Sequence, residues 1–310
     1  MEFKHVSVLL EECIDYLDLK DNGIYLDGTL GGGGHTLQIL KRMPTSQVLA
    51  IDKDSDALLA AGNRLSEYSN RIRYIHDDFH NAYEHLDKYY PEGIDGAILD
   101  LGVSSYQIDT AERGFSYMQD ALLDMRMDQN QSLSAFNVVN EYSEYDLNKI
   151  FYEYGEERFS RRIASAIVNA RQDMTISTTS QLVSIIEKAV PASQRFKGGH
   201  PAKRVFQAIR IEVNGELNGL YEAIEQIAMR LKKGGRMCVI TFHSLEDRIV
   251  KNVFRTLEAD CICDKSSPIC TCNKRKEVNI LTKKPIVATD EELTINPRSS
   301  SAKLRVIERV

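Results

Sequence analysis

Ile24-Tyr-Leu-Asp27, followed directly by Gly28-Thr-Leu-Gly31-Gly-Gly-Gly34-His35, is the stretch of sequence that decides the fold. A short apolar strand ends in a carboxylate, and four consecutive glycines then lead into a helix-like segment. Glycine suits such a loop because it adopts positive φ at little cost and lets the backbone approach a ligand closely. The stretch therefore predicts a nucleotide-binding loop, in which His35 either contacts the ligand or only caps the helix.

The spacing of the glycines distinguishes between classes of nucleotide. Gly31 and Gly33 fit the dinucleotide pattern G-x-G-x-x-G, but Thr36 stands at the third glycine, which disfavours NAD. The lysine and hydroxyl residue of a phosphate-binding P-loop do not follow the glycines. An acidic strand end before Gly31 and Gly33 resembles motif I of S-adenosylmethionine methyltransferases, although Thr29 occupies the place of one further glycine.

Three later segments repeat the pattern of a buried strand that ends in polar residues. They are Gln47–Asp52, Ile72–His76 with Asp77, Asp78 and Phe79 after it, and Ile94–Asp100. The carboxyl ends of parallel strands share one edge of an open α/β sheet, where ligands bind. We expect Asp52 to hold a ribose, Asp77 or Asp78 an adenine amine, and Phe79 the face of the base. Each Asp alone could instead cap a helix or turn, and Phe79 alone could be a core residue.

The order of these segments indicates the domain organisation. Strands and helices alternate at βα lengths through residues 1–105, with helices expected near 35–42, 54–68 and 80–89. Helical periodicity dominates residues 134–190 instead. The alternation resumes with a helix carrying Leu217 to Leu231, a stop at Lys232–Gly235 and a strand over residues 237–242.

The sequence thus predicts an α/β fold with an inserted helical domain. We place the α/β domain at residues 1–108 and 212–310, and the insert at residues 109–211. An insert after the fourth strand lies beside the ligand-binding edge, so we expect it to recognise the substrate. The alternative is a helical bundle that decorates the fold or forms a homodimer.

Composition and charge limit the class of protein. The chain has 310 residues, of which 43% are hydrophobic and 27% charged, as in an ordinary soluble protein. The sequence has neither an apolar tract long enough to span a membrane nor a signal-peptide pattern, so a cytoplasmic location without membrane contact is expected. The net charge of -6 disfavours an indiscriminate nucleic-acid binder but hides local basic runs.

Four basic runs are candidates for phosphate contact. They are Arg195, Lys197, Lys203, Arg204 and Arg210; Lys274, Arg275 and Lys276; Lys283 and Lys284; and Arg298, Lys303, Arg305 and Arg309. Solvated faces are the usual alternative. We expect phosphate contact from the first run, with Lys203 and Arg204, because Gly198-Gly-His-Pro201 indicates a loop rather than a helix face.

The six cysteines fall into two groups. Cys13 and Cys238 have apolar neighbours and are expected to be inert core residues. The other four form Cys261-x-Cys263-x6-Cys270-x-Cys272 in a turn-rich segment. In a reducing cytoplasm such a cluster favours zinc over disulfides, with surface thiols as the alternative. We assign no metal to the ligand-binding edge and no catalytic role to this segment.

Seven runs, in order along the whole chain, closely resemble the bacterial 16S ribosomal RNA cytosine-N4 methyltransferase family, called H in the small-subunit series. They are Thr29–His35, Asp100–Ser105, Glu112–Ser116, Asp124–Asp128, Gly198–Ala208, Thr241–Arg248 and Ser301–Arg305. Any single run would be weak evidence, but seven in order are highly specific. The cysteine segment is the main departure from the family pattern.

The resemblance implies a class I Rossmann-like methyltransferase fold with an inserted helical domain. It implies S-adenosylmethionine as the cofactor, with contacts from Gly33, Gly34, His35, Asp52, Phe79, Asp100 and Gln107. Gln107 rests on the resemblance alone. The reaction implied is methylation of the N4 amine of a decoding-centre cytosine near the P site. Its partner would be 16S ribosomal RNA in the 30S subunit, and not DNA.

The catalytic group is open at this stage, with Asp100, Ser104 and Ser105 as candidates because amino methyltransferases place an acid or amide here. The Pro-Pro-aromatic sequence that usually follows is replaced, so the aromatic residue that clamps the base is unassigned. Tyr106, Phe115 and Tyr117 are candidates for it, with packing as the alternative, and His243 and Glu246 are either rim groups or helix caps. The competing functions are an amino methyltransferase for DNA or another RNA, and an RNA assembly factor that binds the cofactor without turnover.

Overall fold

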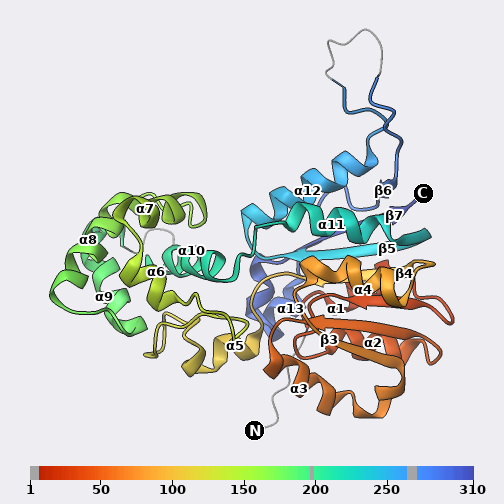
Figure 1. Cartoon of the computed structure of the whole chain (residues 1–310), viewed down its shortest axis with the longest axis horizontal. Coiled ribbons are helices and arrows are strands. Elements are labelled where there is room, and N and C mark those ends of the chain that lie inside the picture. The colour runs from red at the N-terminus through yellow and green to blue at the C-terminus, as the bar shows by residue number, and fades with distance from the viewer. Residues whose placement is uncertain (1–6, 196–198, 264–270) are drawn as a thin grey trace. The chain divides into compact units, whose positions relative to one another are not determined.

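The computed structural model describes residues 7–195, 199–263 and 271–310 of the chain (Figure 1). The chain divides into two compact units. Unit 1 comprises residues 1–102 and 217–310, and unit 2 comprises residues 103–216. The sequence placed the corresponding boundaries at 108/109 and 211/212.

Unit 1 is built on a seven-stranded sheet with the order β3-β2-β1-β4-β5-β7-β6. The strands are β1 (Ile24–Asp27), β2 (Gln47–Asp52), β3 (Ile72–His76), β4 (Ile94–Asp100), β5 (Leu231–Thr241), β6 (Val278–Ile280) and β7 (Lys303–Arg309). The first five run parallel, whereas β7 pairs antiparallel with both β5 and β6. The four strands predicted before residue 105 are confirmed at their expected positions.

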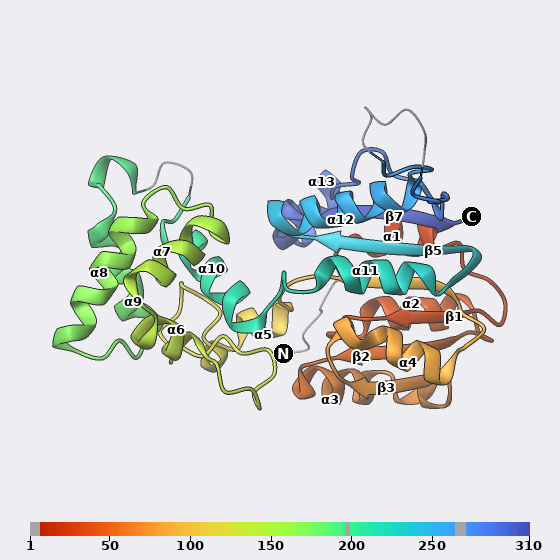
Figure 2. The same cartoon turned by 45° about the horizontal axis from the view of Figure 1, so that its top comes forward.

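Helices cover both faces of this sheet because successive strand residues point to opposite sides. On β2, Val48 and Ala50 join the core that α1 (Leu10–Leu17), α2 (Gly34–Arg42) and α3 (Ser55–Arg64) cover. Leu49 and Ile51 face the other core, under α4 (Ala82–Tyr89), α11 (Leu220–Met229) and α12 (Ser244–Glu258). Figure 2 shows the sheet with these helices on its two faces. A last short helix, α13 (Asp290–Ile295), lies in the chain between β6 and β7.

Two features of unit 1 differ from the sequence prediction. The helix α11 is shorter than predicted and excludes Leu217 and Leu231. Strand β5 begins at Leu231, before the glycines that were predicted to end the helix. The strand includes these glycines as an irregularity: Gly234 has a φ of 71°, and the register against β4 shifts between Ile94 and Gly96. Strands β6 and β7 were not predicted, although Val306 and Ile307 of β7 are fully buried on opposite faces.

Unit 2 is helical, as predicted for residues 134–190. Its helices are α5 (Ser105–Asp109), α6 (Ala135–Glu141), α7 (Glu144–Glu153), α8 (Ser160–Asp173), α9 (Thr179–Ala189) and α10 (Ala202–Asn214). They bury their own apolar core, including Phe151, Ile163 and Ile186. Across the described residues, no helix is long and apolar enough to cross a membrane.

Candidate functional site

The glycine loop joins β1 to α2 at the carboxyl edge of the sheet in unit 1. Gly31 and Gly33 have φ of 48° and 70°, values that residues other than glycine rarely adopt. A Cβ on Gly33 would lie 2.8 Å from Leu65 Cδ1, and one on Gly34 would lie 1.9 Å from Ser7 Oγ. A side chain would be strained at Gly31 and Gly33 and would crowd Leu65 or Ser7 at Gly33 and Gly34, so the loop favours glycine at these positions.

Asp27, at the end of β1, is almost completely buried beneath this loop. The hydroxyl of Thr36 donates to Asp27 Oδ2 at 2.6 Å, and burial raises the pKa of Asp27 to about 6. Thr36 is the residue that stands at the third glycine of the dinucleotide pattern. Its hydroxyl holds the carboxyl group in place, a role that the sequence did not indicate.

Asp52, at the end of β2, fixes the loop from the neighbouring strand. Its Oδ2 accepts from the Gly31 N–H at 2.7 Å, and its Oδ1 accepts from the Asp54 N–H at 2.9 Å. Burial raises the pKa of Asp52 to about 6 despite these hydrogen bonds. Each carboxylate oxygen can accept a second hydrogen bond, so ribose hydroxyls could still bind it.

Asp100, at the end of β4, is the most perturbed carboxyl group of the edge. Burial raises its pKa to about 8, and the charges of Asp27, Glu246 and Glu292 act in the same direction. Within the described residues, its buried Oδ1 atom has no hydrogen-bond partner. Its backbone N–H donates to the Thr29 hydroxyl at 2.6 Å, a bond that ties the glycine loop to β4 and that the sequence did not indicate.

The polar residues after β3 behave differently. Asp78 accepts hydrogen bonds from the backbone and ring of His80 and from Lys53 Nζ at 3.1 Å. Asp77 accepts from His85 Nε2 at 2.8 Å and from Asn81 Nδ2 at 2.9 Å. Asp78 thus caps the short turn that Phe79 begins, which is the alternative that the sequence left open, and Asp77 is bonded to His85 and Asn81.

Phe79 lies beside the glycine loop, in a short turn after β3. Its ring stacks on His80, with the ring centres 4.2 Å apart. A Cβ on Gly28 would lie 3.4 Å from Phe79 Cβ, so the first residue of the loop and this residue are neighbours. The position suits a residue that covers a base, and the cofactor contact itself stays a prediction.

Three further rim candidates have structural roles in unit 1. The ring N–H of His35 donates to the Val8 carbonyl at 3.2 Å, while Gly33, not His35, is the N-cap of α2. His243 caps α12, and Glu246 Oε2 accepts from the backbone N–H groups of Phe242 and His243. His243 and Glu246 thus form a capping box, the second of the two roles expected for them.

The candidates in unit 2 start at α5. Ser104 Oγ accepts from the Gln107 N–H at 3.2 Å, and Gln107 Oε1 accepts from the Ser104 N–H at 2.9 Å. Both side chains therefore complete the N-terminus of α5, which Ser105 begins. Among the candidate base clamps, Phe115 is buried and Tyr117 stacks on His200, whereas Tyr106 is 46% exposed.

Three arginines of unit 2, among them Arg210 of the first basic run, are engaged within the unit itself. Arg113 is buried and donates to the carbonyls of Arg126 and Met127, and Arg126 pairs with both oxygens of Asp124. Arg210 pairs with both oxygens of Glu216 at 2.8 Å. These side chains hold the fold of the unit together.

The prediction that the first basic run is a loop was wrong for Lys203 and Arg204. Both are exposed on the first turn of α10, because the helix begins at Ala202, directly after Pro201. Arg204 Nη1 donates to the Glu156 carbonyl at 3.0 Å. Lys197 and Gly198 lie outside the described residues.

The C-terminal basic run has mostly structural roles in unit 1. Arg305, in β7, is buried and pairs with both oxygens of Asp247, and Arg309 pairs with Glu277. These roles were missed because β7 itself was not predicted. Cys13 and Cys238 are fully buried, as expected of core residues.

The edge of unit 1 fits S-adenosylmethionine by the chemistry of its donor and acceptor groups. An adenosine ribose needs paired hydroxyl acceptors, which Asp52 offers, and the cofactor's methionine part needs a close backbone, which the glycines offer. The cationic sulfonium favours a carboxylate nearby, and Asp100 has a buried oxygen that the described residues leave without a partner. A parallel sheet with the order found here, an antiparallel β7 and this edge define a class I methyltransferase that uses S-adenosylmethionine.

Comparison with known proteins identifies the family within this class. The model of the MraW methylase family matches residues 2–310, so the chain belongs to that family. The chain is similar to the ribosomal RNA small subunit methyltransferase H of Clostridioides difficile strain 630, with 52% identity over 100% of both chains. It is also similar to the protein of the same name from Clostridium botulinum strain Kyoto, with 55% identity over 100% of both chains.

A solved structure of a rRNA methylase from Streptococcus thermophilus aligns with 98% of both chains, at 16% identity and a TM-score of 0.45.

Proposed function

We propose that the protein transfers the methyl group of S-adenosylmethionine to the N4 amine of a P-site cytosine in 16S ribosomal RNA of the small subunit. Relatives named ribosomal RNA small subunit methyltransferase H, 52% and 55% identical over their full length, support RNA of the small ribosomal subunit as the substrate. The observation that carries the chemistry is Asp100, whose Oδ1 atom is buried at the end of β4 without a partner in the described residues.

The chemistry of the amine explains why such a carboxyl group is needed. The lone pair of the cytosine N4 amine is delocalised into the ring, so the amine is a poor nucleophile that must be oriented and must lose a proton. The cofactor supplies an activated methyl group on a sulfonium. Asp100 holds the acceptor for the amine proton, and burial raises its pKa to about 8, nearer to neutral pH than an ordinary carboxyl group.

A covalent enzyme adduct is not part of this proposal. Methylation of a ring carbon of cytosine requires a cysteine nucleophile, whereas an exocyclic amine attacks the methyl group directly. Cys13 and Cys238, the cysteines of the sheet core, are fully buried, and burial raises the pKa of Cys13 well above its usual value. Neither thiol is available for attack on a base.

Recognition of the RNA is assigned to unit 2. A structured base must be unstacked before it enters a methyltransferase pocket, which costs a few kcal/mol that contacts to the RNA have to offset. Lys203 and Arg204 are exposed on the first turn of α10 and are proposed to contact phosphate. Tyr106, at 46% exposure, is the best placed of the three aromatic candidates to stack on a base.

The direct experiment uses 30S subunits that lack the modification. The protein is incubated with them and with methyl-labelled S-adenosylmethionine, and the RNA is digested to nucleosides for mass analysis. N4-methylcytidine from 16S RNA is expected. Label on DNA alone would favour a DNA methyltransferase, and cofactor binding without transfer would favour an assembly factor.

The RNA interaction is tested by the double variant Lys203→Ala with Arg204→Ala. We expect unchanged cofactor affinity, weaker RNA binding, and a salt dependence whose slope falls by about one unit for each phosphate that is no longer neutralised. Arg161→Ala with Arg162→Ala, two exposed residues of α8, removes the same charge and serves as the control. Equal weakening in both double variants would show that only net charge matters.

A further inference from the structure

The segment between α12 and β6 forms an arm that has little core of its own. We call the described residues 259–263 and 271–277 the cysteine arm, which Figure 1 shows extending from the sheet. None of these described residues is buried or belongs to a helix or strand, and Ile262 is 59% exposed. Hydrophobic burial therefore contributes little to its structure, as in small domains that rely on metals or disulfides.

The base of the arm is fixed by ordinary hydrogen bonds. The Glu277 N–H donates to the Leu257 carbonyl at 2.9 Å, and the Val310 N–H donates to the Glu277 carbonyl at 3.0 Å. Arg309 Nη1 donates to the same carbonyl at 2.7 Å. The end of α12 and the end of β7 thus anchor one leg, and the residues beyond this base need another tie.

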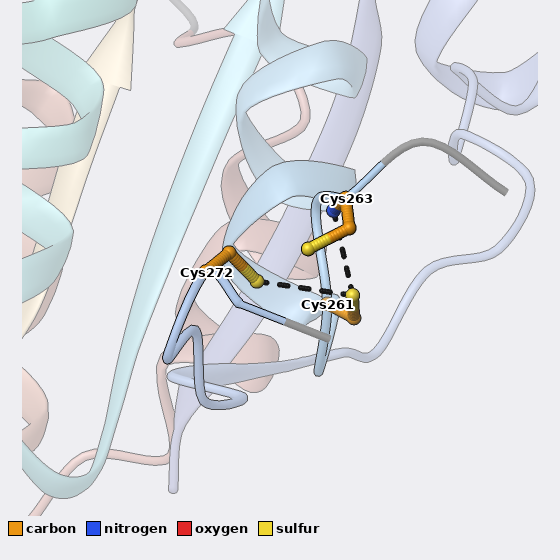
Figure 3. Close-up of side chains that lie close together, drawn as sticks. All are labelled: Cys261, Cys263 and Cys272. Carbon is orange, nitrogen blue, oxygen red and sulfur yellow. Dashed lines mark hydrogen bonds between the residues drawn. The ribbon is translucent and has the colours of Figure 1, made fainter. Parts of the chain in front are cut away.

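Beyond the base, three cysteine sulfurs lie together (Figure 3). The Sγ atoms of Cys261, Cys263 and Cys272 all lie within 4.8 Å of one another, and those of Cys261 and Cys272 are 3.8 Å apart. A disulfide would need about 2.05 Å. Four thiolates around zinc at about 2.3 Å stand about 3.8 Å apart at the corners of a tetrahedron. The distance between the sulfurs of Cys261 and Cys272 matches metal coordination, and Cys263 Sγ lies within 4.8 Å of both.

Backbone N–H groups point at all three sulfurs. The Cys263 N–H donates to Cys261 Sγ at 3.4 Å. Two more N–H groups reach from one leg of the arm to the other: Thr271 donates to Cys263 Sγ at 3.4 Å, and Ile262 to Cys272 Sγ at 3.5 Å. Such donors stabilise the negative charge of a thiolate and orient it as a ligand.

We propose that Cys261, Cys263 and Cys272 bind one zinc ion, which ties the two legs of the cysteine arm together. Zinc is favoured because thiolates are soft ligands and the 3.8 Å between the sulfurs of Cys261 and Cys272 is the spacing of two ligands of a tetrahedral zinc site. Each thiol releases its proton to solvent as its bond to zinc forms, and no electron is transferred. The fourth cysteine of the sequence cluster, Cys270, lies outside the described residues and is not part of the assignment.

The position of this site makes it structural. Glu246, in the first turn of α12, is close enough to Asp100 to raise its pKa, whereas the arm begins after the last residue of the same helix, Glu258. A helix of 15 residues is about 22 Å long. The zinc would therefore not touch the reacting atoms, and its removal should leave cofactor binding unchanged.

Metal content tests the site. The reduced full-length protein, expressed with zinc in the medium, should contain about one zinc per chain, and Cys261→Ser and Cys272→Ser should lose it. Cys13→Ala removes a buried thiol outside the cluster and should keep the zinc. Cobalt in place of zinc should give thiolate-to-metal charge-transfer bands that Cys261→Ser and Cys272→Ser lose. A zinc-free reduced protein, or equal zinc in the cysteine variants, would overturn the assignment.

Limited proteolysis tests whether zinc holds the two legs of the cysteine arm together. Lys274, Arg275 and Lys276 begin two residues after Cys272 and offer trypsin cleavage points. Removal of zinc by a chelator should speed cleavage there several-fold in the native protein, and Cys272→Ser should be cleaved fast with or without chelator. S-adenosylmethionine titrations should not change. An unchanged cleavage rate after zinc removal would contradict the role of the metal in the arm.

Discussion

Two sets of strand-end carboxyl groups in the same sheet have opposite electrostatics. Asp27, Asp52 and Asp100, after β1, β2 and β4, have pKa values raised by burial to about 6, 6 and 8. Burial acts on Asp77 and Asp78 after β3 as well, but hydrogen bonds, chiefly from His85 and His80, lower both pKa values. The first set has few side-chain donors, whereas Asp77 and Asp78 are bonded to histidines and Asp78 also to Lys53.

The difference separates ligand-binding groups from structural ones. A buried carboxyl group without a cation is costly, and a fold retains it where a ligand supplies the missing partner. Asp78 already has Lys53 and His80, so it has little to gain from a ligand. Of the three acids around the glycine loop, Asp27 is held by Thr36, and Asp52 and Asp100 are the ones we assign to cofactor and substrate.

The largest expected effect is on catalysis. Asp100→Asn keeps the shape of the side chain but removes the acceptor for the amine proton, so methyl transfer to 30S subunits should fall by about 10²–10⁴-fold. Asp78→Asn is the matched control at the same edge and should stay near the native rate. Equal losses of activity in the two variants would erase the distinction between the two sets.

The next effect is a pair of opposite pH dependences in stability. A raised folded-state pKa stabilises the fold at low pH, and this contribution is lost as the pH rises from 3.8 towards 8, by at most about 1.4 kcal/mol per pH unit. Asp100→Asn should thus leave the free energy of unfolding unchanged near pH 3.8 and raise it increasingly as the pH approaches the folded-state pKa of about 8. Asp78, with a lowered pKa, contributes stability above pH 3.8 that is lost below it.

Asp78→Asn should therefore destabilise the protein at neutral pH, and this destabilisation should shrink as the pH falls below the ordinary Asp value. Denaturant unfolding of the native protein and both variants, at a series of pH values, gives the free energies of unfolding. The same direction of change in both variants would mean that the two carboxyl groups share one environment.

The smallest expected effect concerns Lys53. Its Nζ lies 3.1 Å from Asp78 Oδ2, and both side chains are partly exposed. Lys53→Met should raise the pKa of Asp78 and cost about 0.2–1 kcal/mol of stability, a cost that high salt should hide. Lys41→Met, at an exposed position of α2, removes the same charge as a control. A destabilisation that persists in high salt would point to packing rather than charge.

Much of the fold could be predicted from the sequence because its local signals agree with its tertiary structure. The apolar runs at residues 24–27 and 47–52 end in acids and are followed by helical periodicity, and both became buried parallel strands. Strand β7 was missed because Arg305 and Arg309 made the tail look like a basic surface. Their partners, Asp247 and Glu277, are 58 and 32 residues away in sequence, so only the folded chain brings them together.

The site was predictable by position but not by role. The sequence placed Asp52, Asp78 and Asp100 at one edge, yet nothing local distinguished Asp78, whose partner Lys53 is 25 residues away. Thr29 and Thr36 were missed because a hydroxyl in a glycine loop gives no sign of which carboxyl group or backbone N–H it will meet. Long-range hydrogen bonds decide these roles, and a sequence pattern does not record them.

The most direct test of the central claim is a calorimetric titration of S-adenosylmethionine into the native protein, Asp52→Ala and Asp78→Ala. Removal of the charged acceptor at Asp52 should weaken binding by about 1.5–3 kcal/mol, roughly tenfold to 150-fold. Asp78→Ala should bind within about twofold of the native protein, since the charges around Asp78 are already paired. Equal weakening in both variants, or a larger effect for Asp78→Ala, would contradict the assignment of the cofactor edge.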